Sequence, residues 1–245
     1  MHKKELITIG NASEILGISI QTLRRWDESG RLTAHKTEGG QRRYVESEIQ
    51  SLADGLIFEL AHKWASKSTP PTLNSDVHCQ DRSIFEGRLQ RLNGAITRAG
   101  IEQNLTSLVI TATGEIGNNS FDHNLGKWPD VPGVFFDYNI DDGIIVLADR
   151  GLGILATLHR VRPELEKHTD ALRVAFTEIV TGRAPEKRGN GLKYIMKIAK
   201  MGMVGIKFQT GNALLEIDAG ATDFKIIVAN TFIKGTIAII KFKTN

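Results

Sequence analysis

This sequence of 245 residues has a single cysteine and lacks long apolar runs and a strong excess of either charge. Cys79 is the only cysteine, which excludes an intrachain disulfide framework and a zinc site built from several thiolates. No stretch approaches the roughly 20 apolar residues that a membrane-spanning helix needs. The first residues also lack the apolar core of a signal peptide. A net charge of +3 indicates no strongly basic tail. We therefore expect a cytoplasmic protein without a membrane partner.

The composition is otherwise that of a globular protein, 41% hydrophobic and 24% charged. It changes once along the chain, at 66–76, where paired prolines and small hydroxyl residues are typical of a linker. Apolar residues at helical spacing from about Glu46 to Ala65 lead into this stretch. The sequence thus predicts a small domain at 1–65, a linker at 66–76 and a larger domain at 77–245.

The first domain is predicted to consist of short helices separated by tight turns. Asn11 or Ser13 can cap a first helix that ends at Gly17. Ser19 can cap a second helix that runs from Ile20 to Ser29. Two short helices joined in this way form the unit whose second helix enters the major groove of DNA.

The second predicted helix and the segment after it are also rich in basic side chains. Between Arg24 and Tyr44 the sequence has six Lys or Arg and three acidic residues, a local excess of three that agrees with phosphate contacts. Gly39–Gly40 predicts a hairpin turn, which would place the residues after it on a short wing beside the second helix. The alternative is a helical protein-interaction module whose charges are merely solvated.

The residue order in this segment resembles the winged helix-turn-helix domains of the MerR family and of the related recombination directionality proteins. The resemblance is specific at Thr22-Leu-Arg-Arg-Trp26 and at Gly39-Gly-Gln-Arg-Arg-Tyr44. MerR regulators usually continue into a dimerising coiled coil and an effector domain, whereas a linker and a different domain follow here. The resemblance therefore implies binding to double-stranded DNA but no metal or drug sensing. The DNA contacts that it implies are Thr22, Arg24, Arg25, Arg42, Arg43 and Tyr44.

The second domain is predicted to be α+β, with helices on one face of a mixed, mostly antiparallel sheet. Two helices are expected before Gly126, followed by a β-hairpin that turns at Asp141–Gly143. Further helices are expected around 171–181 and 191–201. The β-like stretches that close the chain lie near 204–210, 213–218, 224–229 and 236–242.

The first of three motifs in this domain is Glu115–Asp122, on the second predicted helix. Glu115 and Asn119 are one helical turn apart and share a face. A carboxylate in this position can deprotonate a water molecule, and an amide oxygen is a suitable ligand for Mg²⁺. The alternative is that Glu115 and Asp122 are ordinary solvated charges.

The other two motifs are rich in glycine. Asp149-Arg-Gly-Leu-Gly153 follows an apolar strand, where a carboxylate could accept a hydrogen bond from an exocyclic amine. Gly189-Asn-Gly191 precedes a helix whose first N–H groups could bind phosphate oxygens. Each motif is also compatible with a simple turn. A P-loop and a complete dinucleotide fingerprint are both missing from the sequence.

The order of the three motifs resembles the GHKL ATPases, the Bergerat-fold group that includes gyrase, MutL and the histidine kinases. The resemblance implies a two-layer α/β sandwich that binds ATP and Mg²⁺. It implies that Glu115 is the general base, Asn119 the Mg²⁺ ligand and Asp149 the reader of the adenine amine. The segment Ile154–Arg188 would be the lid over ATP. The further ATP contacts that it implies are Asp122, Gly151, Gly153, Gly189, Gly191, Leu192 and Thr236.

Three functions remain open at this point. The leading hypothesis is a homodimeric DNA-binding regulator in which ATP, with or without hydrolysis, acts as a switch. The second is a protein kinase of the anti-sigma or histidine-kinase type that acts on a partner protein. No histidine in the sequence is followed by the Glu-Leu-Arg-Thr-Pro pattern that marks a phosphoacceptor helix, which counts against autophosphorylation. The third is a pseudo-enzyme whose pocket serves only as a structural module.

Overall fold

The computed structural model describes residues 5–178 and 191–244. The chain forms two compact units, Met1–Glu59 and Leu60–Asn245. The division falls inside one continuous helix, α3 (Glu46–Ser66), so the first unit passes into the second without a break in the helix. The long helix predicted ahead of the proline-rich stretch is thus confirmed.

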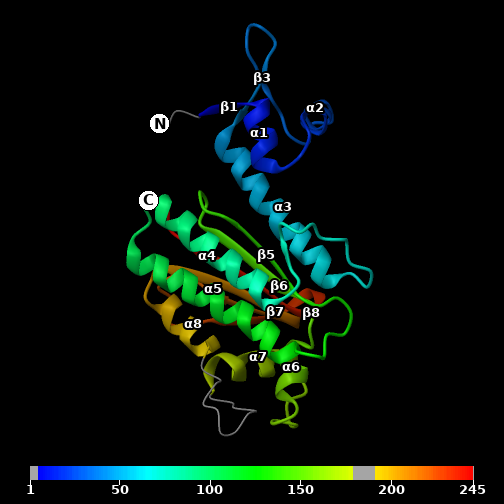
Figure 1. The fold of residues 1–245 in the computed structure, drawn as a ribbon, viewed down its shortest axis with the longest axis vertical. Coiled ribbons are helices and arrows are strands. Elements are labelled where there is room, and N and C mark those ends of the chain that lie inside the picture. Colours follow the sequence, from blue (N-terminus) through cyan, green and yellow to red (C-terminus); the bar gives the residue numbers. More distant parts are fainter. Residues whose placement is uncertain (1–4, 179–190, 245) are drawn as a thin grey trace. The chain divides into compact units, whose positions relative to one another are not determined.

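The first unit is a winged arrangement of helices and short strands (Figure 1). Its three-stranded antiparallel sheet has the order β1-β3-β2. The elements before α3 are β1 (Leu6–Thr8), α1 (Ile9–Leu16), α2 (Ile20–Glu28), β2 (His35–Lys36) and β3 (Arg42–Val45).

The ends of α1 and α2 show which residues were enough to predict a helix boundary. Ser19 caps α2 as predicted, since its hydroxyl accepts a hydrogen bond from the N–H of Thr22 at 3.1 Å. Gly17 ends α1 in a left-handed conformation, with φ of 61°. The predicted cap of α1 at Asn11 or Ser13 is wrong, because Thr8 fills that position and accepts from the N–H of Asn11 at 3.1 Å. The reason is β1, a strand too short for its pattern to show in the sequence.

The second unit contains a five-stranded sheet with the order β4-β5-β6-β8-β7, and each neighbouring pair is antiparallel. The α+β class is confirmed, whereas the expected mixture of strand directions is not found among the described strands. The strands are β4 (His78–Cys79), β5 (Val134–Asn139), β6 (Ile144–Asp149), β7 (Val204–Ile217) and β8 (Lys225–Phe242).

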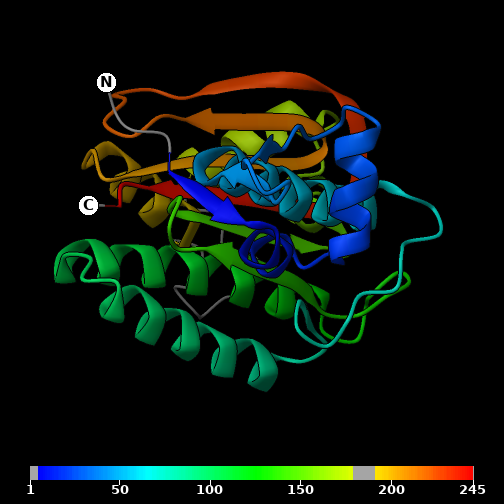
Figure 2. The ribbon, with the colours of Figure 1, turned by 90° about the horizontal axis from the view of Figure 1, so that it is seen from above.

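Helices cover one face of this sheet. In Figure 1, α4, α5 and α8 lie over the strands, and Figure 2 shows α4 and α5 side by side beneath the sheet. The helices of the second unit are α4 (Arg82–Arg98), α5 (Gln103–Asn124), α6 (Gly153–Leu158), α7 (His168–Thr177) and α8 (Gly191–Lys200).

The four β-like stretches at the end of the chain form two long strands rather than four. β7 and β8 stay paired across a change of register between Thr210 and Ala213. Gly211 lies there with φ of 55°, and the bulge interrupts the alternation of apolar residues without ending the strand. A sequence pattern cannot tell such a bulge from the end of a strand.

The core lies between the sheet and α5. Val109, Ala112 and Ile116 of α5 are buried against strand residues such as Ile145. Gly117 permits the close approach of α4, because a Cβ there would lie 2.1 Å from the ring of Phe85. Within the described ranges, no helix has both the length and the apolar character needed to cross a bilayer.

Candidate functional site

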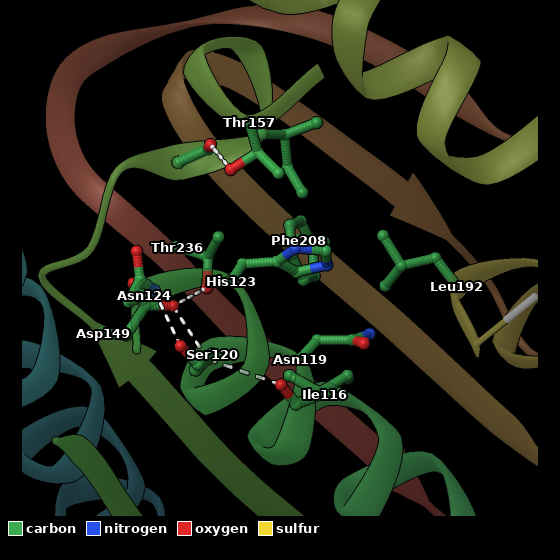
Figure 3. A pocket seen from close by; sticks show the side chains of 12 residues that line it. Ile116, Asn119, Ser120, His123, Asn124, Asp149, Thr157, Leu192, Phe208 and Thr236 are labelled. Atoms are coloured by element: carbon green, nitrogen blue, oxygen red, sulfur yellow. Dashed lines mark hydrogen bonds between the residues drawn. The ribbon is translucent and has the colours of Figure 1, made fainter. Parts of the chain in front are cut away.

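A pocket opens in the second unit where α5, α6 and α8 meet the sheet (Figure 3). It brings together residues from six elements between α5 and β8. Figure 3 shows Asp149, Ser120 and Thr236 gathered on one side, with Asn119 between them and Leu192. The lining residues are Ile116, Asn119, Ser120, His123, Asn124, Asp149, Gly153, Ile154, Thr157, Leu192, Phe208 and Thr236.

Asp149 is the buried polar centre of this pocket, with an exposed fraction of 1%. It ends β6 opposite Thr236 of β8, and the Thr236 hydroxyl donates to its Oδ2. The hydroxyl of Ser120 donates to the same oxygen at 2.9 Å, and the N–H of Gly151 donates to Oδ1 at 2.7 Å. Three donors from three elements therefore fix the orientation of one carboxylate.

Burial and hydrogen bonding act on this carboxylate in opposite directions. Burial raises the pKa of Asp149, and the bonds from Thr236, Gly151 and Ser120 lower it. Burial has the larger effect, so the pKa lies above its usual value. The three bonds favour the ionised form of Asp149, which accepts hydrogen bonds and donates none.

The glycines around Asp149 allow the backbone to come close to neighbouring groups. A Cβ on Gly151 would lie 2.1 Å from Nδ2 of Asn124, a buried residue whose Oδ1 accepts from the N–H of Leu152 at 2.8 Å. A Cβ on Gly235 would lie 2.3 Å from Oδ1 of Asp149. These positions exclude larger residues, so Gly151 and Gly235 allow close packing around Asp149.

Glu115 and Asn119 meet the start of α8. A Cβ on Gly191 would lie 2.5 Å from Oε2 of Glu115 and 3.3 Å from Nδ2 of Asn119. The first turn of α8 thus begins directly against the carboxylate and the amide. Glu115 is exposed, whereas Asn119 is half-buried and lines the pocket.

Two residues that were predicted to contact ATP, Asp122 and Gly189, are not placed at this pocket by the described structure. Asp122 forms an ion pair with Arg82 of α4 and is not among the pocket-lining residues, so the geometry gives no support to an ATP contact there. Gly189 lies outside the described residues, as does the part of the expected lid from 179 to 188. The part of that lid that is described contains α6 and α7.

Ser120 and Asn124 line the pocket and Thr210 supports it, although the sequence gave none of the three a role. Ser120 lies inside the Glu115–Asp122 motif and Asn124 lies one turn further along α5, so the polar residues of this helix face were a signal that could have been read. Thr210 gave no signal, because it comes from β7. Its hydroxyl donates to the carbonyl of Gly235 at 2.9 Å and accepts from the N–H of Ile154 at 3.1 Å. It therefore joins α6 to the strand that carries Thr236.

In the first unit, the residues predicted to contact DNA differ in exposure. Arg24 and Arg25 of α2 are exposed, and Thr22 and Arg43 are half-buried. Tyr44 is 1% exposed and packs in the core, so this geometry gives its predicted DNA contact no support.

Arg42 connects the wing to α2. Its Nε donates to Oδ2 of Asp27 at 2.6 Å, and Oδ1 of Asp27 accepts from the N–H of Ala34 at 2.9 Å. Asp27 therefore binds both the residue before β2 and the first residue of β3, and its pKa is lowered by the Ala34 N–H and by Arg42.

Asp27→Asn is expected to destabilise the protein at pH 7 by about 1.5–3 kcal/mol, the usual contribution of hydrogen bonds to a charged group. Because the folded pKa lies below that of the unfolded chain, the stabilisation is full above about pH 4 and is lost as pH falls further. Thermal unfolding of both proteins at pH 7 and pH 3 should show a clearly smaller difference at pH 3. An equal difference at both values would refute the role of the ionised carboxylate.

Comparison with known proteins bears on the first unit. No curated protein matched the chain. Residues 8–44 match the family described as MerR family regulatory protein. This match runs from the cap of α1 through α2 to the wing. The first unit therefore carries a MerR-type helix-turn-helix domain.

Proposed function

We propose that this protein is a DNA-binding regulator whose second unit binds ATP with Mg²⁺ and acts as a nucleotide switch. The observation that carries the nucleotide site is the convergence of three separate motifs. Asp149 with its glycines, the pair Glu115 and Asn119, and Gly191 at the start of α8 lie around one pocket or directly against its wall. No single element of the fold requires this convergence.

The residues around Asp149 fit the adenine end of ATP. A buried carboxylate that is held in place by Ser120 and Thr236 can accept a hydrogen bond from the exocyclic amine. Ile116 and Phe208 supply apolar walls for the ring. The close packing of Gly235 against Asp149 keeps the backbone of β8 against this end of the pocket.

The residues around Gly191 fit the phosphate end. The first N–H groups of α8 are unpaired within the helix and suit phosphate oxygens. Mg²⁺ usually binds phosphate oxygens and few protein oxygens, and Asn119 would supply such an oxygen. When bound, Mg²⁺ neutralises charge on the phosphates. Glu115, one turn earlier on α5, is placed to orient a water molecule and to take its proton.

Calorimetric titration with ATP and Mg²⁺ tests the nucleotide site directly. We expect saturable one-to-one binding that is lost without Mg²⁺ or becomes much weaker. Absence of binding heat at any temperature, together with no shift of the melting temperature, would reject the proposed site.

For DNA, the proposal rests on the match of residues 8–44 and on exposed basic side chains of α2. Arg25→Ala and Arg43→Ala should each weaken binding to a random-sequence duplex. Each should also lower the slope of log K against log salt by about 1, because one phosphate contact is lost. Fluorescence anisotropy over a salt series measures both quantities.

Arg98→Ala is the matched control for these variants. Arg98 is exposed at the end of α4 in the second unit, so its loss removes the same charge without touching the helix-turn-helix. Salt-independent binding of the wild type, or equal effects of all three variants, would contradict a phosphate-contacting surface on α2 and the wing.

A further inference from the structure

Arg150 is a charged residue that does not line the pocket. It follows Asp149 directly in the sequence, and its side chain is fully buried. Nε donates to both carboxylate oxygens of Asp130, at 3.0 and 3.2 Å, and Nη2 donates to the same carboxylate. Such a planar, two-sided pair fixes the guanidinium strongly.

The remaining nitrogen of Arg150 reaches the end of α3. Nη1 donates to the carbonyls of Trp64 and Lys67, the latter at 2.9 Å. The last carbonyls of a helix have no partner within the helix and carry its negative dipole end. Arg150 therefore caps the C-terminal end of α3, and the ring of Trp64 lies 6.0 Å from the guanidinium carbon.

A second connection reaches the same carboxylate from β8. Nζ of Lys234 donates to Oδ2 of Asp130 at 2.9 Å. Lys234 stands two residues before Thr236, which binds Asp149. Asp130 thus binds the residue that follows Asp149 and a residue two positions before Thr236. Its pKa is well below the usual value because of Arg150 and then Lys234, so it is ionised at neutral pH.

Side chains at the end of β6 and in β8 therefore reach in two different directions. Asp149 and Thr236, which are paired in register, point to the pocket. Arg150 and Lys234 reach instead to Asp130, and Arg150 also to α3. For Arg150 this agrees with the alternation of neighbouring side chains along a strand. Lys234 stands two residues before Thr236, and Gly235 between them has a φ of 65° that interrupts the extended backbone. Because Arg150 follows Asp149 directly, we expect a change in the bonds of Asp149 to shift the backbone segment that carries Arg150.

We propose that Arg150 and Asp130 couple the nucleotide pocket to the C-terminal end of α3, the helix that continues into the helix-turn-helix unit. This inference builds on the proposed function, because a nucleotide in the pocket would be the natural input. Arg150 is a positioning residue and touches no nucleotide. A purely structural cap would change stability without changing how the end of α3 responds to the pocket.

Hydrogen exchange of the amides at 60–67 in the full chain tests the coupling without nucleotide. Thr236→Val removes one bond of Asp149 and should change exchange at 60–67 by at least about fivefold, the lower end of known coupling factors. In an Arg150→Lys background, which keeps the charge but not the fork, the same substitution should change it less than twofold. Lys207→Ala, which breaks an ion pair with Glu216 elsewhere in the sheet, is the control and should have no effect there.

Two results would overturn the coupling. One is unchanged exchange at 60–67 in Thr236→Val; the other is an equal change in the two backgrounds. If Arg150→Lys does not fold, as judged by circular dichroism, Asp130→Asn replaces it with the same expectation.

Addition of Mg²⁺ with a non-hydrolysable ATP analogue gives the second arm. It should change exchange at 60–67 in the wild type but not in Arg150→Lys, which still binds the analogue. A response of equal size in both proteins would contradict the coupling. A lack of analogue binding would instead refute the proposed function, while the comparison without nucleotide still decides the coupling.

Discussion

Glu115→Ala is expected to lower ATP turnover by about 10²–10⁴-fold, the usual contribution of a general base, while ATP still binds. The carboxylate lies against Gly191, at the proposed phosphate end, whereas Asp149 is held by Ser120, Thr236 and Gly151. Phosphate release gives the turnover, and calorimetry gives the Kd for ATP with Mg²⁺.

Glu86→Ala is the control, since Glu86 is an exposed carboxylate on the neighbouring helix α4. It should keep wild-type turnover. Equal turnover in the wild type and Glu115→Ala would remove the general-base role. Transfer of labelled phosphate to a protein, in place of release, would favour the kinase alternative.

Asp149→Asn is expected to weaken ATP binding by about 10- to 150-fold, which corresponds to about 1.5–3 kcal/mol for a hydrogen bond to a charged group. An amide would place a donor where Ser120, Thr236 and the N–H of Gly151 all donate. The side chain would be nearly the same size but could no longer accept from every partner.

The preference for ATP over GTP is a more specific test of this substitution than affinity alone. Because the proposed partner of Asp149 is an exocyclic amine of adenine, the wild type should bind ATP more tightly than GTP, and Asp149→Asn should lose that preference. Asp137→Asn, on the adjacent strand β5, is a matched control at another carboxylate whose pKa is raised by burial. Unchanged affinity and base preference in Asp149→Asn would exclude it from the site.

The sequence was most informative where a local signal determines a local structure. Ser19 and Gly17 have side-chain or backbone properties that set a helix end by themselves, and the structure confirms both. Thr8 was missed because its role depends on the pairing of β1 with a strand more than 30 residues later.

The same distinction holds at the candidate site. Asp149 and Asn119 could be predicted because each belongs to a short motif, and both line the pocket. Thr210 could not be predicted, since it is an ordinary strand residue until the fold brings it to Gly235. Arg150 stood inside a predicted motif, but its partners, Trp64 and Asp130, come from distant parts of the chain.

In the proposed switch, nucleotide bound to the second unit controls DNA binding by the first. The most direct measurement is the Kd of the full chain for a labelled random-sequence duplex, with the size of the complex, in the absence of nucleotide, with ATP and Mg²⁺, and with ADP and Mg²⁺. A nucleotide switch predicts that ATP changes the Kd by at least about fivefold relative to ADP, or that it changes the stoichiometry of the complex. The same affinity and the same complex size in all three states would contradict it.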